Sequence, residues 1–376
     1  MSATGSRQGF AASRVAPALS RVALALVMGL LTLGTGRPGQ AQEPAAEPGV
    51  EAPLPPEPPP TWRFKQVDRP VKVVVLAGSI GAWPKQPYAE RIAKMCKHVE
   101  VKNLSKVGFG AFALRQRFKQ QVLERLPQLR AAGNEYWLVF QGGLNSVGTP
   151  ERTNHDIREM FVLAHARGFK VVGLTLTPWG DDEDKRWRGP GGLKYLRATT
   201  RVVDFVLGAL TPAEALGEFA GRRAAGAEAE WQAEERADVA VDLYRSALRA
   251  EDRPLRDAAG LERALTKDRG WQAAHAELAE DARAAALRSD AAAAAEIPRW
   301  FLRDELRSFD HIHPNSEGHR LIAEAACPRL PASWGCECPT LPAPRVAQQP
   351  ASPNLLLLFA PPWLRVLLGW PAWPVR

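Results

Sequence analysis

Hydrophobic and polar positions follow two alternating patterns along the middle of the chain. Residues 71–77 (VKVVVLA) form a nearly continuous apolar, β-branched run, typical of a strand buried on both faces of a parallel sheet. Residues 113–130 instead place apolar side chains at helical spacing. The patterns predict strands at Val71–Ala77, Val99–Leu104, Glu135–Gln141, Lys170–Leu176 and Asp238–Leu243. They predict helices at Tyr88–Lys97, Ala113–Arg130, Asn154–Arg167, Leu193–Leu210 and Glu317–Ala326.

Strands that alternate with helices predict an α/β fold with a parallel sheet and helices on both of its faces. The connections between parallel strands are expected to be right-handed. We therefore expect one α/β/α three-layer sandwich with a five-stranded parallel sheet, spanning residues 67–339. Its roughly 280 residues are enough for one such domain with insertions.

Two segments exceed what a minimal domain of this kind needs, at about residues 211–235 and 246–306. Both are rich in Ala, Glu and Arg, and the run Ala291–Ala295 favours helix by intrinsic propensity. We interpret them as helical insertions that form a lid or cap near the substrate site. The alternative is a helical cover with only a scaffolding role, because insertions in surface loops are well tolerated.

The first 41 residues have the pattern of a secretory signal peptide. Arg7, Arg14 and Arg21 precede the apolar run Val22–Leu33, and small residues follow around Gly39. This predicts an exported, periplasmic or extracellular protein, and an uncleaved signal anchor is the alternative. Residues 42–66 are rich in Pro, Ala and Glu, so we expect an extended, disordered linker.

Residues 340–376 begin with a second Pro-rich stretch and end with the apolar run Asn354–Trp370. Pro361, Pro362 and Arg365 interrupt that run, so it makes a poor transmembrane helix. Its Trp and Leu content suits a weak contact with a membrane interface. The alternative is a tail that covers an apolar patch of the domain.

The charge of the chain does not indicate a nucleic-acid partner. The formal net charge is +8, and removal of residues 1–41, with four Arg and no acid, would lower it to +4. No basic stripe interleaved with aromatic residues is present in the sequence. The oligomeric state is left open by the sequence.

The chain contains four cysteines, and an even number in an exported protein predicts disulfides. Cys96 ends the first predicted helix and Cys327 ends the last. These helices should be neighbours on one face of the sheet. We expect Cys96 to bond either to Cys327 or to one of the pair Cys336 and Cys338. A zinc site is disfavoured, because the Cys-x-Cys spacing has no nearby His.

Candidate chemistry is concentrated in residues 309–323, FDHIHPNSEGHRLIA. Asp310 and His313 lie three residues apart in a tight loop, before a helix predicted to begin at Asn315 or Ser316. A carboxylate on one ring nitrogen leaves the other free to act as a general base. His311 is the less favoured base because it should face away, and His319 is expected to be structural or exposed.

A general base of this kind needs a nucleophile, and Ser79 follows the first predicted strand. Gly108 follows the second and Asn145 the third. Ligands bind at the carboxyl ends of parallel strands in open sheets. A serine, backbone N–H groups and an Asn amide gathered there could form an oxyanion hole. The alternative for each residue is an ordinary position in a turn.

These residues and their order resemble the SGNH hydrolase superfamily, also called GDSL esterases and lipases. The resemblance covers about Lys72–Ala326 without the insertions, and Asp310–Gly318 (DHIHPNSEG) is its most specific part. It implies a flavodoxin-like fold in which Ser79 is the nucleophile, His313 the base and Asp310 its partner. The Ser79 and Gly108 N–H groups and the Asn145 amide would form the oxyanion hole.

The chain departs from the family pattern at two supporting positions. Ala77-Gly78 stands where the family usually has Gly-Asp, and Asn145-Ser146 stands where it usually has Asn-Asp. The resemblance still predicts an active serine esterase that needs no metal or cofactor. Its substrate would be an acylated small molecule or carbohydrate, with cell-envelope carbohydrate as one candidate. The alternatives are an acyltransferase on the same scaffold and a binding module that has lost activity.

Overall fold

The computed structural model describes residues 62–339, except 190, 225–229, 251–252 and 255. The predicted signal peptide, most of the predicted linker and the C-terminal tail lie outside the described residues. They therefore remain predictions.

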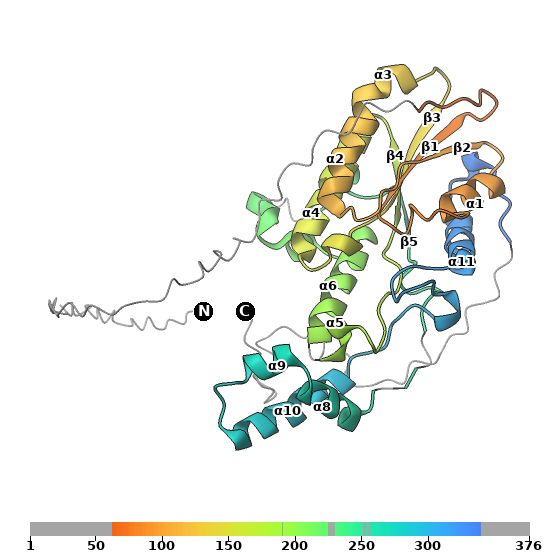
Figure 1. Cartoon of the computed structure of the whole chain (residues 1–376). Coiled ribbons are helices and arrows are strands. Elements are labelled where there is room, and N and C mark those ends of the chain that lie inside the picture. Colours follow the sequence, from red (N-terminus) through yellow and green to blue (C-terminus); the bar gives the residue numbers. More distant parts are fainter. Residues whose placement is uncertain (1–61, 190, 225–229, 251–252, 255, 340–376) are drawn as a thin grey trace, which may run out of the picture. The chain divides into compact units, whose positions relative to one another are not determined.

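A five-stranded parallel sheet forms the centre of the domain, as the sequence pattern predicted (Figure 1). Its strands lie in the order β2-β1-β3-β4-β5, and all neighbouring pairs are parallel. Their bounds are β1 (Val71–Ala77), β2 (Val99–Asn103), β3 (Glu135–Gln141), β4 (Lys170–Leu174) and β5 (Val239–Val241). Because the strands are parallel, their carboxyl ends lie at one edge of the sheet.

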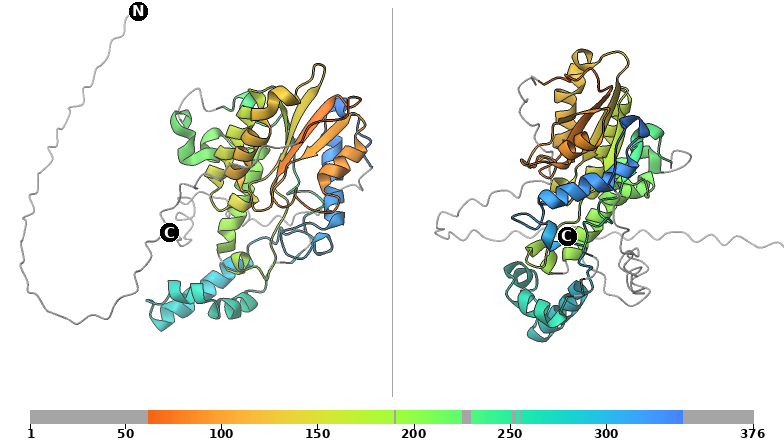
Figure 2. Two further views of the ribbon diagram at one scale, coloured as in Figure 1. Left: turned by 45° about the horizontal axis from the view of Figure 1, so that its top comes forward. Right: turned by 90° about the vertical axis from the view of Figure 1, so that its right-hand side faces the viewer.

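Helices cover both faces of the sheet, which confirms the three-layer α/β/α sandwich (Figures 1 and 2). One face carries α1 (Tyr88–Met95) and α11 (Ser316–Ala326); the other carries α2 (Ala111–Gln121), α4 (Pro150–His165) and α6 (Gly191–Val206). Along β1, Val73 and Val75 pack in the core with α1 and α11, whereas Val74 and Leu76 pack in the core on the opposite face. Burial on both faces explains why this strand is apolar at every position except Lys72.

Several predicted helices and strands have different ends in the structure. The helix predicted at Ala113–Arg130 is divided into α2, η1 (Leu123–Arg125) and α3 (Leu126–Leu129). Pro127 lies in the first turn of α3, where a missing N–H is tolerated. Because proline cannot donate to the preceding turn, it also prevents α2 from continuing into α3. Pro150 likewise begins α4 four residues earlier than predicted.

The segments interpreted as insertions contain several short helices. Residues 211–235 hold α7 (Pro212–Leu216), η3 (Gly217–Ala224) and η4 (Ala233–Glu235). Residues 246–306 hold α8 (Ala258–Thr266), α9 (Arg269–Ala274), α10 (Glu280–Ala295) and η5 (Asp304–Leu306). In Figure 1, α8, α9 and α10 lie together beside α5 (Lys185–Arg188). Helix α8 packs against α10 and α5, and α10 also contacts α6.

Two disulfides hold the segment that follows α11. This segment contains η6 (Cys327–Arg329) and η7 (Ala332–Trp334). Cys96 is bonded to Cys336, 240 residues away in sequence, and Cys327 is bonded to Cys338. The first bond is one of the pairings that the sequence left open, and it joins the end of α1 to the C-terminal segment. With all four cysteines paired, the described residues leave no thiol for the zinc alternative.

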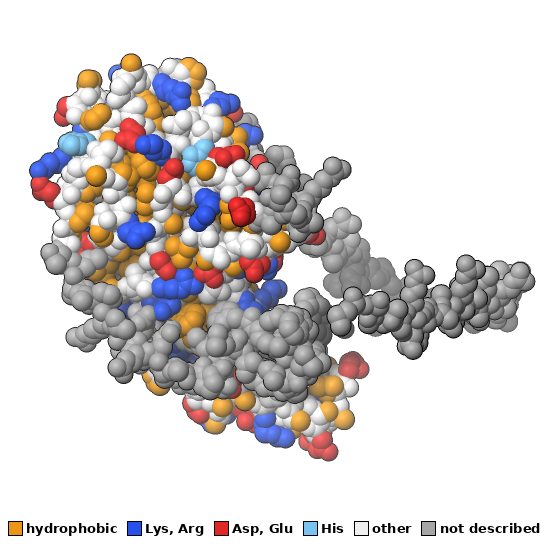
Figure 3. All heavy atoms as spheres, turned by 180° about the vertical axis from the view of Figure 1, so that it is seen from behind, with side chains coloured by type: hydrophobic (Ala, Val, Ile, Leu, Met, Phe, Trp, Pro, Cys, Tyr) orange, Lys and Arg blue, Asp and Glu red, His pale blue; other side chains and the backbone are white. Residues whose placement is uncertain are grey.

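The surface seen in Figure 3 has acidic and basic side chains interspersed rather than gathered in a stripe. Within the described part of the chain, no helix is long and apolar enough to cross a membrane.

Candidate active site

Ser79 lies in a tight turn directly after β1. The N–H of Ala82 donates to the Gly78 carbonyl (3.1 Å), and the N–H of Trp83 donates to the Ile80 carbonyl (3.3 Å). The Asn103 side chain, at the end of β2, donates to the Gly81 carbonyl at 2.8 Å and so holds this turn against the neighbouring strand end. The turn therefore presents Ser79 at the carboxyl edge of the sheet.

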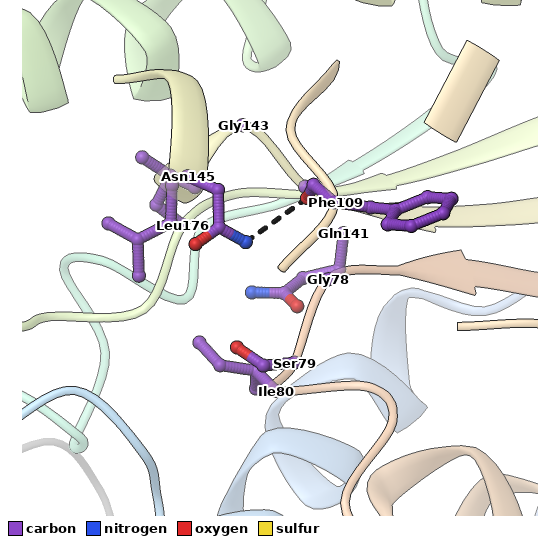
Figure 4. Close-up of a pocket in the computed structure, with 10 residues that line it drawn as sticks. Gly78, Ser79, Ile80, Phe109, Gln141, Gly143, Asn145 and Leu176 are labelled. Atoms are coloured by element: carbon purple, nitrogen blue, oxygen red, sulfur yellow. Dashed lines mark hydrogen bonds between the residues drawn. The ribbon is translucent and has the colours of Figure 1, made fainter. Parts of the chain in front are cut away.

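A small pocket opens beside Ser79, and three polar side chains face it from separate segments (Figure 4). Ser79 follows β1, Gln141 ends β3, and Asn145 lies in η2 (Leu144–Ser146). The rest of the lining is glycine backbone and apolar side chains: Gly78, Ile80, Phe109, Gly142, Gly143, Leu144 and Leu176. The centre of a water molecule has about 10 Å³ of free space in this pocket, which is room for about one water.

Asn145 has a fixed orientation in this pocket. Its side-chain Nδ2 donates to the Phe109 carbonyl at 3.1 Å, and this leaves one further N–H on the same nitrogen. Gly78 permits this arrangement, because a Cβ at that position would approach Asn145 Nδ2 and the Phe109 oxygen to 3.3 Å each. Gly78, one of the two departures from the SGNH pattern, therefore leaves room for the Asn145–Phe109 hydrogen bond beside it.

Gly108 lies near this region but not in the lining of the pocket, where Phe109 takes its place. Its φ of 80° is in the left-handed region that favours glycine. Among the described residues, the backbone N–H groups of Ser79 and Gly108 have no hydrogen-bond acceptor. Both groups are thus free to bind an anion, although the structure brings only Ser79 into the pocket with Asn145.

Ser146, the second departure from the family pattern, has a structural contact. Its Oγ accepts a hydrogen bond from the N–H of Ala111 at 3.1 Å, the first residue of α2. The first N–H groups of a helix have no partner within the helix, so this contact caps α2 from a separate segment. Ser146 therefore connects the Asn145 loop to the helix that follows the Gly108 loop.

Asp310 and His313 form the pair that the sequence predicted. His313 Nδ1 lies 2.8 Å from Asp310 Oδ2, while Asp310 Oδ1 accepts the backbone N–H groups of Ile312 (2.9 Å) and His313 (2.8 Å). With a proton on Nδ1 donated to the carboxylate, Nε2 is left as an acceptor. His313 Nε2 has no hydrogen-bond partner among the described residues.

The environment of Asp310 keeps it ionised. Partial burial alone would raise the pKa of its carboxyl group, but the hydrogen bonds from the N–H groups of His313 and Ile312 lower the pKa below its usual value. A carboxylate that stays charged can stabilise the His313 imidazolium after proton transfer. The pair therefore has the electrostatics of a general base with its supporting acid.

Trp83 connects the Ser79 turn with the Asp310–His313 loop. Its ring is stacked toward Phe309 and His313, with ring centroids 6.3 Å apart in both cases, and Phe309 and His313 are 5.4 Å apart. The described residues show no hydrogen bond between Ser79 and His313. Residue patterns did not single out Trp83, Phe309 or Gln141. The available signals were that Gln141 ends a strand, Trp83 follows the Ser79 turn and Phe309 precedes Asp310.

The two other histidines near this loop have different surroundings. His311 faces away, as expected: its Nε2 lies 3.0 Å from Asp184 Oδ2, and its carbonyl accepts the Gly180 N–H at 2.7 Å. His319 is fully buried between Trp83 and Tyr88. Its ring nitrogens have no partner, and burial, followed by the nearby Arg91 and His313, lowers its pKa to about 4.

The described residues contain no cluster of three or more His, Cys, Asp or Glu side chains suited to hold a metal ion.

Comparisons with known proteins find remote structural likeness only. No known family and no curated protein matches the chain. A GDSL-like lipase from Bacteroides thetaiotaomicron is 13% identical, with 68% of this chain and 84% of that chain covered and a TM-score of 0.37. A lipolytic protein of the G-D-S-L family from Veillonella parvula is 11% identical, covering 68% and 96%, with a TM-score of 0.35.

An acetyl xylan esterase from Geobacillus stearothermophilus, solved as a variant, is 11% identical, covering 72% of this chain and 97% of that chain, with a TM-score of 0.35. Such low identities and TM-scores assign neither a family nor an activity. The chain is remotely similar in structure to these proteins, and its own site residues carry the functional argument.

Proposed function

We propose that this protein is a serine hydrolase that cleaves carboxylic esters through an acyl-enzyme intermediate. The observation that supports this most directly is the Asp310–His313 pair, with His313 Nε2 unpartnered and Trp83 packed between its loop and the Ser79 turn. The unpartnered N–H groups of Ser79 and Asn145 beside one small pocket add the second element, donors for a developing oxyanion.

In this mechanism the Ser79 hydroxyl attacks the ester carbonyl carbon as its proton passes to His313 Nε2. Asp310 stabilises the resulting imidazolium. The oxyanion accepts hydrogen bonds from the Ser79 N–H and from Asn145, with the Gly108 N–H as the proposed third donor. The intermediate then expels the alcohol, which takes the proton from His313. Water repeats the sequence on the acyl-enzyme and releases the acid.

The size of the pocket favours a short acyl group. Room for about one water suits a methyl-sized group better than a long chain, which would need a continuous apolar channel. We therefore propose acetyl esters as substrates, with acetylated carbohydrate of the cell envelope as the candidate class. This role also presumes the export that the N-terminal segment predicts.

The test is covalent labelling of the purified full chain with a fluorophosphonate serine probe, followed by peptide mapping. We expect labelling at Ser79, its loss in Ser79→Ala, and strong weakening in His313→Ala. Ser289→Ala, on the exposed face of α10, is the matched control and should label like the wild type. Hydrolysis of aryl acetate and aryl octanoate then tests acyl length, with acetate preferred.

Folded wild-type protein that neither labels nor hydrolyses aryl acetate would contradict the proposal and favour a binding module. Labelling at Ser79 with transfer of the acetyl group to an added sugar, in preference to water, would instead show an acyltransferase. Faster hydrolysis of octanoate would contradict the short acyl group while leaving the nucleophile established.

A further inference from the structure

A second cleft lies away from Ser79, between the loop after β4 and helix α8. Its volume is about 570 Å³, much larger than the pocket beside Ser79. Six charged side chains line it: Arg256, Arg263, Lys267, Arg299, Asp182 and Asp257. With four basic groups and two acidic groups, the lining carries a formal charge of +2. We call this site the basic cleft.

Arg256 is the unusual member of this set. The residue is only 6% exposed, and its Nη1 donates to the Trp187 carbonyl. Its Nε and Nη2 atoms are buried with no hydrogen-bond partner. A buried cation without a full set of acceptors is strongly disfavoured, and such residues are normally paired or hold a ligand.

Asp182 forms an ion pair with Arg256, but it is held mainly by Arg299. Asp182 Oδ1 accepts a hydrogen bond from Arg299 Nε at 3.2 Å, and Asp182 Oδ2 lies 3.0 Å from Arg299 Nη2. Asp182 Oδ1 also lies 3.4 Å from Arg256 Nε, but without hydrogen-bond geometry. Asp257 is occupied as the N-cap of α8, accepting the N–H groups of Ala259 and Gly260. Neither carboxylate therefore accepts a hydrogen bond from Arg256 Nε or Nη2.

The two unpaired N–H groups of Arg256 identify the chemistry of a ligand. Nε and Nη2 are neighbours along one edge of the planar guanidinium, the arrangement that binds two oxygens of a carboxylate or phosphate at once. Arg263 and Lys267 provide further positive charge at the open side; the Arg263 side chain is 72% exposed. We propose that the basic cleft binds an oxyanion, a carboxylate or a phosphate group, through Arg256.

The basic cleft is linked to the candidate active site by one loop. This loop contacts the Asp310–His313 loop and the segment before it. Gly180 donates to the His311 carbonyl, and Asp184 pairs with His311. Asp181 accepts a hydrogen bond from Arg307 at 2.9 Å. Asp182, the intervening residue, faces the basic cleft instead. A bound anion could therefore belong to an acidic portion of the ester substrate, or be a separate anion.

The test is calorimetric titration of the full chain with inorganic phosphate and, separately, with glucuronate. We expect saturable binding of at least one of them at one site. Arg263→Ala/Lys267→Ala should weaken it at least tenfold, and Arg256→Met should abolish it. The matched control is Arg269→Ala/Arg288→Ala, which removes the same charge from exposed positions on α9 and α10 and should change affinity less than twofold.

Absence of saturable binding of both anions to the wild type would overturn the inference. Equal weakening by the control pair would also overturn it, because it would indicate a general charge effect. If Arg256→Met does not fold, the exposed double variant still decides. Binding can be measured without catalysis, so this inference stands or falls independently of the esterase proposal.

Hydrolysis separates the two sources of the anion. If the Arg263→Ala/Lys267→Ala variant raises KM for acetylated glucuronate but not for neutral aryl acetate, the anion belongs to the substrate. If phosphate binding is lost while both KM values are unchanged, the basic cleft takes a separate anion. Both outcomes support an oxyanion site.

Discussion

The region around Ser79 and the basic cleft both contain a buried basic side chain with unpaired nitrogens, but they accommodate it differently. His319, beneath Trp83, stays neutral because burial lowers its pKa to about 4. Arg256 has no such option. Burial lowers the pKa of Arg256 as well, but a guanidinium remains charged at any physiological pH. A neutral imidazole can therefore be buried without partners, whereas a buried guanidinium with two nitrogens that lack a hydrogen-bond acceptor indicates a missing ligand.

The largest expected effect compares two histidines of the Asp310–His313 loop, of which only one is proposed as the base. His313→Ala should reduce kcat for aryl acetate on the order of 10⁴-fold or more, because the base and its carboxylate partner act as a unit. His311→Ala should change kcat less than tenfold, since His311 pairs with Asp184 rather than facing Ser79. Steady-state kinetics check both. A larger loss in His311→Ala would assign the base to His311.

Asn145→Ala should reduce kcat by about 10²–10³-fold with little change in KM, the usual effect of removing one oxyanion donor. The same variant should bind phosphate in the basic cleft like the wild type, which would separate the two regions. Steady-state kinetics and calorimetry measure these. An unchanged kcat would mean that the Asn145 amide only positions the Phe109 carbonyl.

The buried His319 predicts a loss of stability in acid. Because its folded pKa is about 4 and its ordinary value about 6.5, the unfolded chain binds a proton between these values that the folded chain does not. The contribution of neutral His319 is thus fully present above pH 6.5 and is lost as the pH falls toward 4. Between pH 6.5 and 5 this loss amounts to roughly 1–2 kcal/mol of unfolding free energy.

His319→Leu, similar in volume and without polar nitrogens, should remove this part of the pH dependence. Urea unfolding of both proteins at pH 6.5 and 5 measures it, with His98→Leu, at an exposed position between α1 and β2, as the control. Parallel losses in the wild type and His319→Leu would show that other groups cause the acid sensitivity.

The smallest expected effect is the stabilisation of the folded protein by phosphate bound in the basic cleft. Phosphate at ten times its dissociation constant should raise the unfolding free energy of the wild type by about 1.4 kcal/mol. Arg256→Met should show no such gain and, without phosphate, should be as stable as the wild type, because it removes an incompletely paired buried charge. Urea unfolding at matched ionic strength measures both. A large destabilisation without phosphate would show that Arg256 is structural.

The sequence alone determined the alternation of strands and helices, the parallel sheet that this alternation implies, and the pairing of Asp310 with His313. These follow from local information: a strand buried on both faces is apolar at most positions, and residues three apart in a tight loop are close in any fold. Helix ends were less accessible, because Pro127 and Pro150 moved them by rules that compete with apolar periodicity.

Only the tertiary structure decided which distant residues meet. It placed Gln141 beside Ser79, packed Trp83 between the two loops, and chose Cys336 as the partner of Cys96. It also buried Arg256 with two guanidinium nitrogens that lack hydrogen-bond acceptors. The local sequence indicates only the start of a helix at this point. Burial and partner geometry depend on packing between segments far apart in the chain, and residue types at a given spacing do not encode them.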